Sequence, residues 1–152
     1  MKFTPKHINR FLFFKLPSAW ISGIRLKSIN DSEAVVTAKH RWINQNPFNS
    51  MYFAVLAMGA ELSTGILVMK KIQDTGKHIS MLVTGTQAEF TKKAKGRIRF
   101  VCEEGKLIDD KITQAVQTGE GVQFNLTSNA YDEAGDLVCT FVFRWSIKLK
   151  NM

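Results

Sequence analysis

Residues 47 to 72 read PFNSMYFAVLAMGAELSTGILVMKKI and form the longest apolar run of this 152-residue chain. Between Met51 and Met69 the only charged residue is Glu61. An apolar run without a polar face is typical of a helix that is buried on nearly every side. A helix of about 20 residues is about 30 Å long, which is enough to cross a small domain. The run therefore predicts a central buried helix over residues 49 to 72.

The two ends of this run carry residues typical of helix ends. Asn49 and Ser50 follow a proline and have side-chain oxygens that accept hydrogen bonds from the first N–H groups of a helix. Lys70 and Lys71 suit the negative end of the helix dipole. We therefore expect Asn49 or Ser50 to cap the start of the helix.

The same run is long enough to cross a membrane, but two features argue against a membrane span. A carboxylate at its midpoint would cost about 2.5 kcal/mol or more in lipid. Small side chains also let a β-sheet approach the helix closely, namely Ala54, Ala57, Gly59 and Ala60. We predict a central helix wrapped by a sheet, with no membrane span.

Length and composition favour one domain, residues 1 to 152, with 45% hydrophobic and 22% charged residues. The net charge of +8 favours an anionic partner, which could be nucleic acid, an anionic membrane surface or a phosphorylated small molecule.

The two cysteines, Cys102 and Cys139, lie in apolar alternating runs without metal-ligand spacing. We expect buried free thiols, no metal site and a cytoplasmic location.

Residues 1 to 17 predict a short helix that begins at Thr4-Pro5. The apolar stretch from Phe11 to Phe14 is too short for a signal peptide. One interpretation is a helix that caps the open end of a sheet. The other is a membrane-surface anchor, because cations surround the apolar stripe: Lys2, Lys6, Arg10 and Lys15.

Alternation of apolar and polar residues predicts strands on both sides of the central helix. The predicted strands cover residues 20–29, 33–42, 78–90, 97–102, 122–131 and 137–149. For residues 33–42 the alternation predicts one solvated face. Residues 104 to 119 fit either a short helix or an irregular connection. This order of elements predicts an α+β fold with a mostly antiparallel sheet.

The pattern resembles the hotdog-fold thioesterase superfamily over about residues 20 to 149. Its acyl-CoA thioesterases have an Asn in the loop before the helix and an acid within the helix, matched here by Asn46 and by Met58-Gly59-Ala60-Glu61-Leu62. The segments AEFTKKAKGRIRF and YDEAGDLVCTFVFRW resemble the family's turn near coenzyme A and its last hairpin. The resemblance implies a hotdog fold, thioester hydrolysis, a homodimer or tetramer, and no cofactor beyond the coenzyme A of the substrate.

The resemblance also implies a site at the dimer interface, where the helix start of one subunit meets the acid of the other. It implies Glu61 as base or nucleophile and Asn46 as a second catalytic residue. We expect the substrate to contact residues at and beyond the helix start: Asn49, Tyr52, Phe53 and Thr64. The chain departs from the family here, because Tyr52 and Phe53 stand where the thioesterases have the His-Gly of a His-Gly-Gly start.

Glu61 has two interpretations on chemical grounds. A carboxylate in an apolar groove can act as a general base or attack the thioester carbonyl, while free N–H groups at a helix start stabilise the developing oxyanion. About three helical turns separate Ser50 from Glu61, roughly 16 Å, so one subunit would not bring both to one carbonyl. The alternative is a structural carboxylate, hydrogen-bonded to backbone N–H groups or to a threonine. Thr64, one turn on, could orient Glu61 or the attacking water.

A cluster of five cations lies within eight residues: Lys92, Lys93, Lys95, Arg97 and Arg99. It fits a solvated strand face, and the resemblance implies that Lys92, Lys93, Lys95 and Arg97 bind the phosphates of coenzyme A. Nucleic acid is a third possibility, but no nucleic-acid motif is present, and we expect Phe90 and Phe100 to be buried.

Three functions follow from these interpretations. The first is a thioesterase, the second a non-catalytic acyl-ligand binder, and the third a basic protein that binds nucleic acid or anionic lipid through residues 92 to 99. Turnover separates the first two, and steep salt dependence marks the third. We expect the first, without nucleic acid as a partner.

Overall fold

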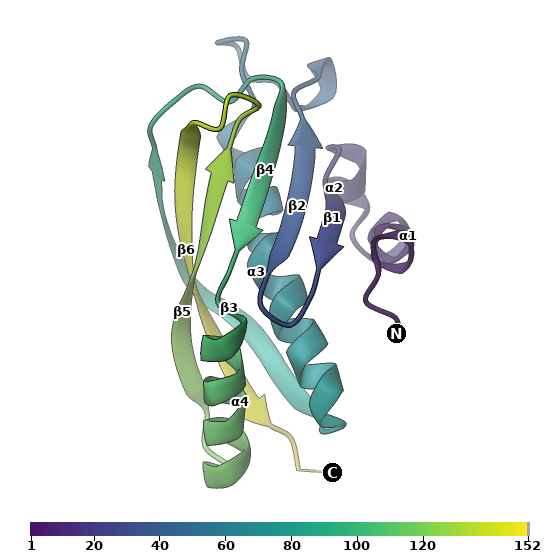
Figure 1. The fold of residues 1–152 in the computed structure, drawn as a ribbon, viewed down its shortest axis with the longest axis vertical. Helices are drawn as coiled ribbons and strands as arrows, with labels where there is room; N and C mark the ends of the chain where they lie inside the picture. Colours follow the sequence, from purple (N-terminus) through teal and green to yellow (C-terminus); the bar gives the residue numbers. More distant parts are fainter. Residues whose placement is uncertain (152) are drawn as a thin grey trace.

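A long antiparallel sheet wraps around one helix in the computed structural model of this chain, which describes residues 1–151 (Figure 1). The helices are α1 (Pro5–Lys15), α2 (Pro17–Ile21), η1 (Trp42–Asn44, a 3-10 turn), α3 (Phe53–Thr75) and α4 (Gly105–Thr118). The strands are β1 (Arg25–Ile29), β2 (Ala34–Lys39), β3 (Ile79–Phe90), β4 (Arg97–Cys102), β5 (Val122–Tyr131) and β6 (Leu137–Leu149).

The six strands form one sheet in the order β1-β2-β4-β5-β6-β3, and every neighbouring pair is antiparallel. β3 and β6 pair along almost their whole length, from Ile79 opposite Leu149 to Phe90 opposite Cys139. The inner face of the sheet curves around α3, and α1 and α2 lie beyond the β1 edge (Figure 1). This arrangement confirms the predicted hotdog fold, with its central helix and its N-terminal helix.

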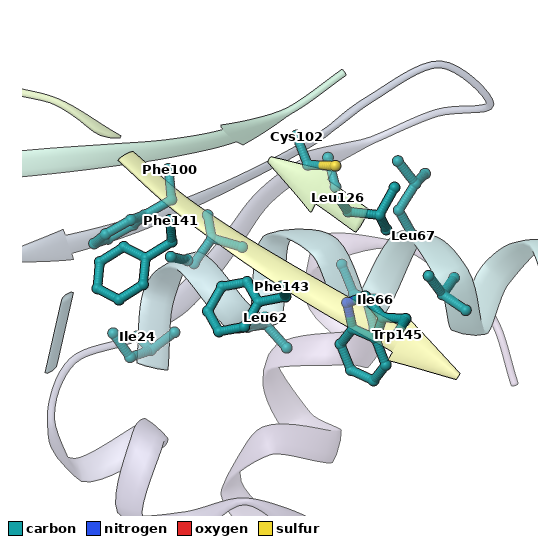
Figure 2. Packing of buried hydrophobic residues seen from close by; sticks show 14 of the residues in the cluster. Ile24, Leu62, Ile66, Leu67, Phe100, Cys102, Leu126, Phe141, Phe143 and Trp145 are labelled. Atoms are coloured by element: carbon teal, nitrogen blue, oxygen red, sulfur yellow. The ribbon is translucent and has the colours of Figure 1, made fainter. Parts of the chain in front are cut away.

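The core lies between α3 and the strands that curve around it. Figure 2 shows Leu62, Ile66 and Leu67 of α3 beside the sheet side chains of this core. Gly59 is required here, because a Cβ at this position would overlap the ring of Phe100, which is completely buried. By length and composition α3 could cross a membrane, but 61% of its most apolar stretch is buried inside the chain, as in a core helix.

The predicted cap of α3 is wrong. The helix begins at Phe53, and Tyr52 occupies the N-cap position without a side-chain hydrogen bond. Asn49 has a φ of 59°, the left-handed conformation that asparagine tolerates, and belongs to the preceding loop. The helix ends at Thr75, three residues later than predicted, where Gly76 adopts a φ of 68° as C-cap.

The N-terminal region contains two helices where the sequence predicted one helix and the start of a strand. Ile8 and Leu12 of α1 are buried, and α1 packs beside β1. Asn9 fixes this contact, because its side chain accepts from the N–H of Leu26 at 2.7 Å and donates to the Leu26 carbonyl at 3.1 Å. α2 was missed, and the strand predicted over residues 20–29 begins only at Arg25.

The solvated face predicted for residues 33–42 is right for Lys39 and Arg41, which are exposed, but wrong for Val35 and Thr37. Val35 and Thr37 point away from α3 but are still buried, at 7% and 8% exposure. β2 lies between β1 and β4, and its outward side chains lie opposite Val101 and Arg99 of β4. Neighbouring strands on both sides therefore cover what an isolated hairpin would expose.

Residues 104–119 are helical, which resolves the two alternatives in favour of α4. Its apolar side packs beside α3, and Lys71 of α3 forms an ion pair with Asp109 at 2.8 Å.

Of the two phenylalanines predicted to be buried, Phe100 is buried. The prediction for Phe90 is wrong, since half of its surface is exposed at the end of the edge strand β3.

Candidate active site

Two of the cavities within residues 1–151 are lined by residues of α3. The larger cavity, about 380 Å³, lies at the start of the helix. The smaller cavity, about 220 Å³, lies beside the middle of the helix. We call them the helix-start cavity and the Glu61 cavity. The residues predicted to be functional divide between them.

The walls of the Glu61 cavity come from four elements: α1, α3, β3 and β6. Apart from Glu61 and Lys15, they are apolar, and they include Phe11, Leu62, Met69, Met81 and Trp145. Burial raises the pKa of the Glu61 carboxyl above its ordinary value. Within residues 1–151 its carboxylate oxygens have no hydrogen-bond or ion-pair partner. A structural role for this carboxylate, the alternative raised by the sequence, would require such hydrogen bonds.

Thr64 is buried and does not orient the Glu61 carboxylate. Its hydroxyl donates to the main-chain carbonyl of Glu61 at 2.9 Å and accepts from the indole N–H of Trp145 at 3.0 Å. Gly65 provides the space for this packing, because a Cβ there would lie 3.1 Å from Trp145 and 3.3 Å from Oε1 of Glu61. Thr64 therefore fixes the Trp145 wall of the cavity.

The start of α3 presents unbonded N–H groups. The N–H of Tyr52 donates to the Asn44 carbonyl at 2.9 Å, and the N–H of Val55 donates to the Tyr52 carbonyl at 2.9 Å. Within the described chain the N–H groups of Phe53 and Ala54 have no acceptor. They lie at the positive end of a 23-residue helix, where an oxyanion is stabilised.

Asn46 organises the loop before α3. Its side-chain oxygen accepts from the N–H groups of Phe48 and Ser50, at 2.9 and 3.2 Å. Its NH₂ group donates to the Ser50 hydroxyl at 3.0 Å and to the Met51 carbonyl at 3.3 Å. Asn46 lines the helix-start cavity, but its amide is already used within the loop.

Asn44 is a positioning residue that the sequence analysis missed. It is buried, and its side chain accepts from the N–H of Arg41 and donates to the carbonyls of Ser22 and Lys39. Through its own carbonyl it holds Tyr52. In the sequence Asn44 is one of several polar residues in a loop, and nothing distinguishes it from Gln45 or Asn46. Its hydrogen bonds to Ser22 and Tyr52 depend on the folded chain, so a local pattern does not reveal them.

Aromatic side chains connect the helix start to the core. Phe53 lines the helix-start cavity with Phe90, and their ring centroids are 6.4 Å apart. Phe90 in turn packs edge-on against Phe141 at 5.6 Å. Tyr52 packs against Phe53 at 5.1 Å, but it lies outside the walls of both cavities, as does Asn49.

The predicted phosphate-binding cations separate into two pairs. Lys92 and Lys93 line the helix-start cavity, whereas Lys95 and Arg97 lie outside its walls. Lys92 forms ion pairs with Asp132 at 2.5 Å and Asp136 at 2.8 Å, which raise its pKa. Lys93 has no acidic partner within residues 1–151 and is therefore the free cation of this cavity.

The cysteines and histidines provide no metal site. No group of three or more potential ligands occurs within residues 1–151. Cys102 and Cys139 are free and buried, as predicted, and burial raises the pKa of each thiol to about 12. Such thiols are poor nucleophiles at neutral pH, so neither cysteine is a candidate reactive group.

The sequence profile of a family described as Domain of unknown function (DUF4442) matches residues 4–147. The chain belongs to the DUF4442 family. None of the proteins with curated descriptions matches this DUF4442 chain.

Several solved structures with the same fold are described as thioesterases. A probable thioesterase from Pseudomonas aeruginosa shares 23% identity, with a TM-score of 0.82 over 97% of each chain. A putative thioesterase from Shewanella oneidensis shares 13% identity, with a TM-score of 0.79 over 96% of this chain and 97% of that one. A thioesterase from Haemophilus influenzae shares 13%, with a TM-score of 0.71 over 98% and 93%. These likenesses establish that this DUF4442 protein has a thioesterase-type hotdog fold.

The two cavities of this DUF4442 protein share no lining residue. Glu61 lies eight residues beyond Phe53, which is about 12 Å along the helix axis. In one chain the oxyanion-type N–H groups and the carboxylate therefore open into different spaces.

Proposed function

We propose that this protein hydrolyses acyl-CoA-type thioesters, with Glu61 as general base or nucleophile. One observation carries the proposal: an unpaired, largely buried carboxylate lines an apolar cavity on the central helix of a thioesterase-type fold. The test is release of free thiol from a panel of acyl-CoAs of different chain lengths.

In the proposed reaction, Glu61 takes a proton from water while the water oxygen attacks the thioester carbonyl carbon. The N–H groups of Phe53 and Ala54 receive the oxyanion of the tetrahedral intermediate. The carbonyl re-forms as the carbon–sulfur bond breaks, and the thiolate of coenzyme A leaves and is protonated. Alternatively, Glu61 attacks directly to form an anhydride, which water then hydrolyses.

The proposed active site is shared between two subunits of a homodimer, or of a tetramer built from such dimers. Support comes from the different spaces into which the helix start and Glu61 open in one chain. The edge strand β3 also has a free backbone edge along 12 residues, with Leu82 exposed on it. Such an edge is suited to pairing with a second copy.

A mixed-subunit experiment tests the shared site. Phe53→Pro removes one free N–H, and proline fits because it is tolerated at the first helical position and Tyr52 has a ψ of 137°. Glu61→Gln removes the base. We expect each variant to be inactive alone and their refolded mixture to recover about a quarter of wild-type turnover. Half of the dimers are mixed, and in each mixed dimer one of the two sites combines an intact helix start with an intact acid.

The control is Phe53→Ala, which removes the same ring but keeps the N–H and should retain turnover. A mixture that stays inactive although mixed dimers are detected by native mass spectrometry would place the complete site within one subunit.

Phosphate recognition by Lys93 gives a second prediction. Lys93→Ala should raise KM for an acyl-CoA up to about fivefold, the effect of losing one exposed ion pair, and leave kcat unchanged. An acyl-pantetheine thioester lacks the nucleotide phosphates, so its KM should not change. Lys95→Ala, outside the cavity, is the matched control, and equal effects of both variants would indicate a general charge effect.

A non-catalytic acyl-ligand binder is the second candidate function. It is favoured by the bulk of Phe53, which takes up space at the helix start where the resembling thioesterases have glycine. Saturable acyl-CoA binding without turnover would identify it. We expect either activity in the cytoplasm, where Cys102 and Cys139 remain reduced.

A further inference from the structure

The first 30 residues are uniformly basic. They contain six lysines and arginines and no aspartate or glutamate, the cations being Lys2, Lys6, Arg10, Lys15, Arg25 and Lys27. Within residues 1–151 none of these six side chains forms an ion pair, whereas Lys70, Lys71 and Lys92 all do. This segment therefore carries an uncompensated positive charge.

The same segment exposes an apolar surface where α1 meets α2. Phe13 is 49% exposed, Phe14 66% and Ile21 57%, with Leu16 beside them at 36%. We call these four residues the corner patch. Phe13 packs edge-on against Phe14 and Trp20, with ring centroids 4.9 Å apart in both cases.

The corner patch is not the core-facing side of α1. Ile8 and Leu12 form that side and are completely buried, and Asn9 fixes the helix on β1. The helix thus already packs on the sheet and still presents aromatic side chains to solvent. Folding of residues 1–151 does not account for this second apolar surface.

We propose that the corner patch docks on an anionic lipid bilayer. Phenylalanine, leucine and isoleucine insert at the boundary between headgroups and acyl chains, and flanking lysines and arginines are attracted to anionic headgroups. A second copy of the chain is the less suitable occupant, because a symmetric contact would bring two segments of charge +6 together.

Docking would place the Glu61 cavity at the membrane. Lys15 and Leu16, which close the corner between α1 and α2, also line this cavity. Docking through the corner patch would therefore bring this part of the cavity wall close to the bilayer surface. The docking itself does not depend on thioesterase activity.

Vesicle co-sedimentation of the full chain tests this proposal. We expect binding to vesicles of phosphatidylcholine with phosphatidylglycerol, weak binding to phosphatidylcholine alone, and loss of binding in high salt. Phe13→Ser with Phe14→Ser, and separately Lys6→Glu with Arg10→Glu, should each lower the partition coefficient about tenfold or more. Circular dichroism checks that each variant is folded.

Two matched controls locate the contact. Trp42→Ser removes an aromatic ring that is 82% exposed elsewhere, and Lys93→Glu with Lys95→Glu reverses two charges of the other basic segment. Both controls should bind like the wild type.

The proposal is overturned if the wild type does not bind anionic vesicles, if the controls lose binding as much as the patch variants, or if the protein binds double-stranded DNA only. It is also overturned if the patch variants change the oligomeric mass in light scattering, since a second copy then occupies the patch.

Discussion

Glu61→Gln is expected to lower kcat/KM for acyl-CoA hydrolysis by at least about a hundredfold, the lower end of what a general base contributes. Glutamine keeps the size of the side chain and fills the same apolar cavity, but it accepts no proton. Saturable binding of acyl-CoA should remain, because the apolar walls and Lys93 are unchanged. Thiol release measures turnover, and titration calorimetry with a non-hydrolysable analogue measures binding.

The matched control is Glu120→Gln, an exposed carboxyl in the turn before β5, which should leave turnover unchanged. Full turnover by the Glu61→Gln protein would remove Glu61 from the chemistry. Equal loss of turnover and of analogue binding would indicate a role in binding instead.

The pH dependence follows from the raised pKa of Glu61. A base must be ionised, so kcat/KM should rise as the pH passes through the raised pKa, above the range of an ordinary glutamate.

The contribution of Glu61 to the free energy of unfolding falls as the pH rises, because the folded state binds the proton more tightly than the unfolded state. Glu61 contributes stability below its unfolded pKa and loses that contribution as the pH rises through the folded pKa. The Glu61→Gln protein should therefore unfold at a higher temperature than wild type at neutral pH.

Gly59→Ala is expected to lower the free energy of unfolding by about 1–3 kcal/mol, although alanine is the better helix former. The added Cβ would overlap the buried ring of Phe100, and close packing leaves that ring little room to move. For a domain of this size each kcal/mol lowers Tm by about 2–4 °C. Urea unfolding and calorimetry measure the change.

Gly121→Ala is the matched control, because the nearest atom to its new Cβ would be 4.0 Å away and its φ is not positive. A double-mutant cycle with Phe100→Leu isolates the contact, since the smaller side chain should relieve part of the cost of Gly59→Ala. Additive effects of the two substitutions would show that the destabilisation arises elsewhere than at Phe100.

The fold was predictable because its signals are local and repeated. Residues 137–149 alternate along the whole of β6, and the apolar run around Glu61, with one acid at its middle, favours a buried helix. Predictions failed where a neighbour distant in sequence decides the outcome. Val35 and Thr37 of β2 are buried because β1 and β4 flank this strand. α3 begins at Phe53 because Asn44 and the Asn46 loop hold the preceding residues in another conformation.

The candidate site divides in the same way. The sequence by itself determined that Glu61 is the one acid of a buried helix and that cations follow β3, because charge and burial are read directly from residue type and periodicity. Only the tertiary structure decided which of these groups share a cavity. In the folded chain Lys93 lines the cavity at the helix start, and Thr64 accepts a hydrogen bond from Trp145. The Glu61 carboxylate lines the other cavity without a partner. The physical reason is that hydrogen bonds, ion pairs and cavities join residues far apart in sequence, such as Thr64 and Trp145, 81 positions apart, which no local pattern specifies.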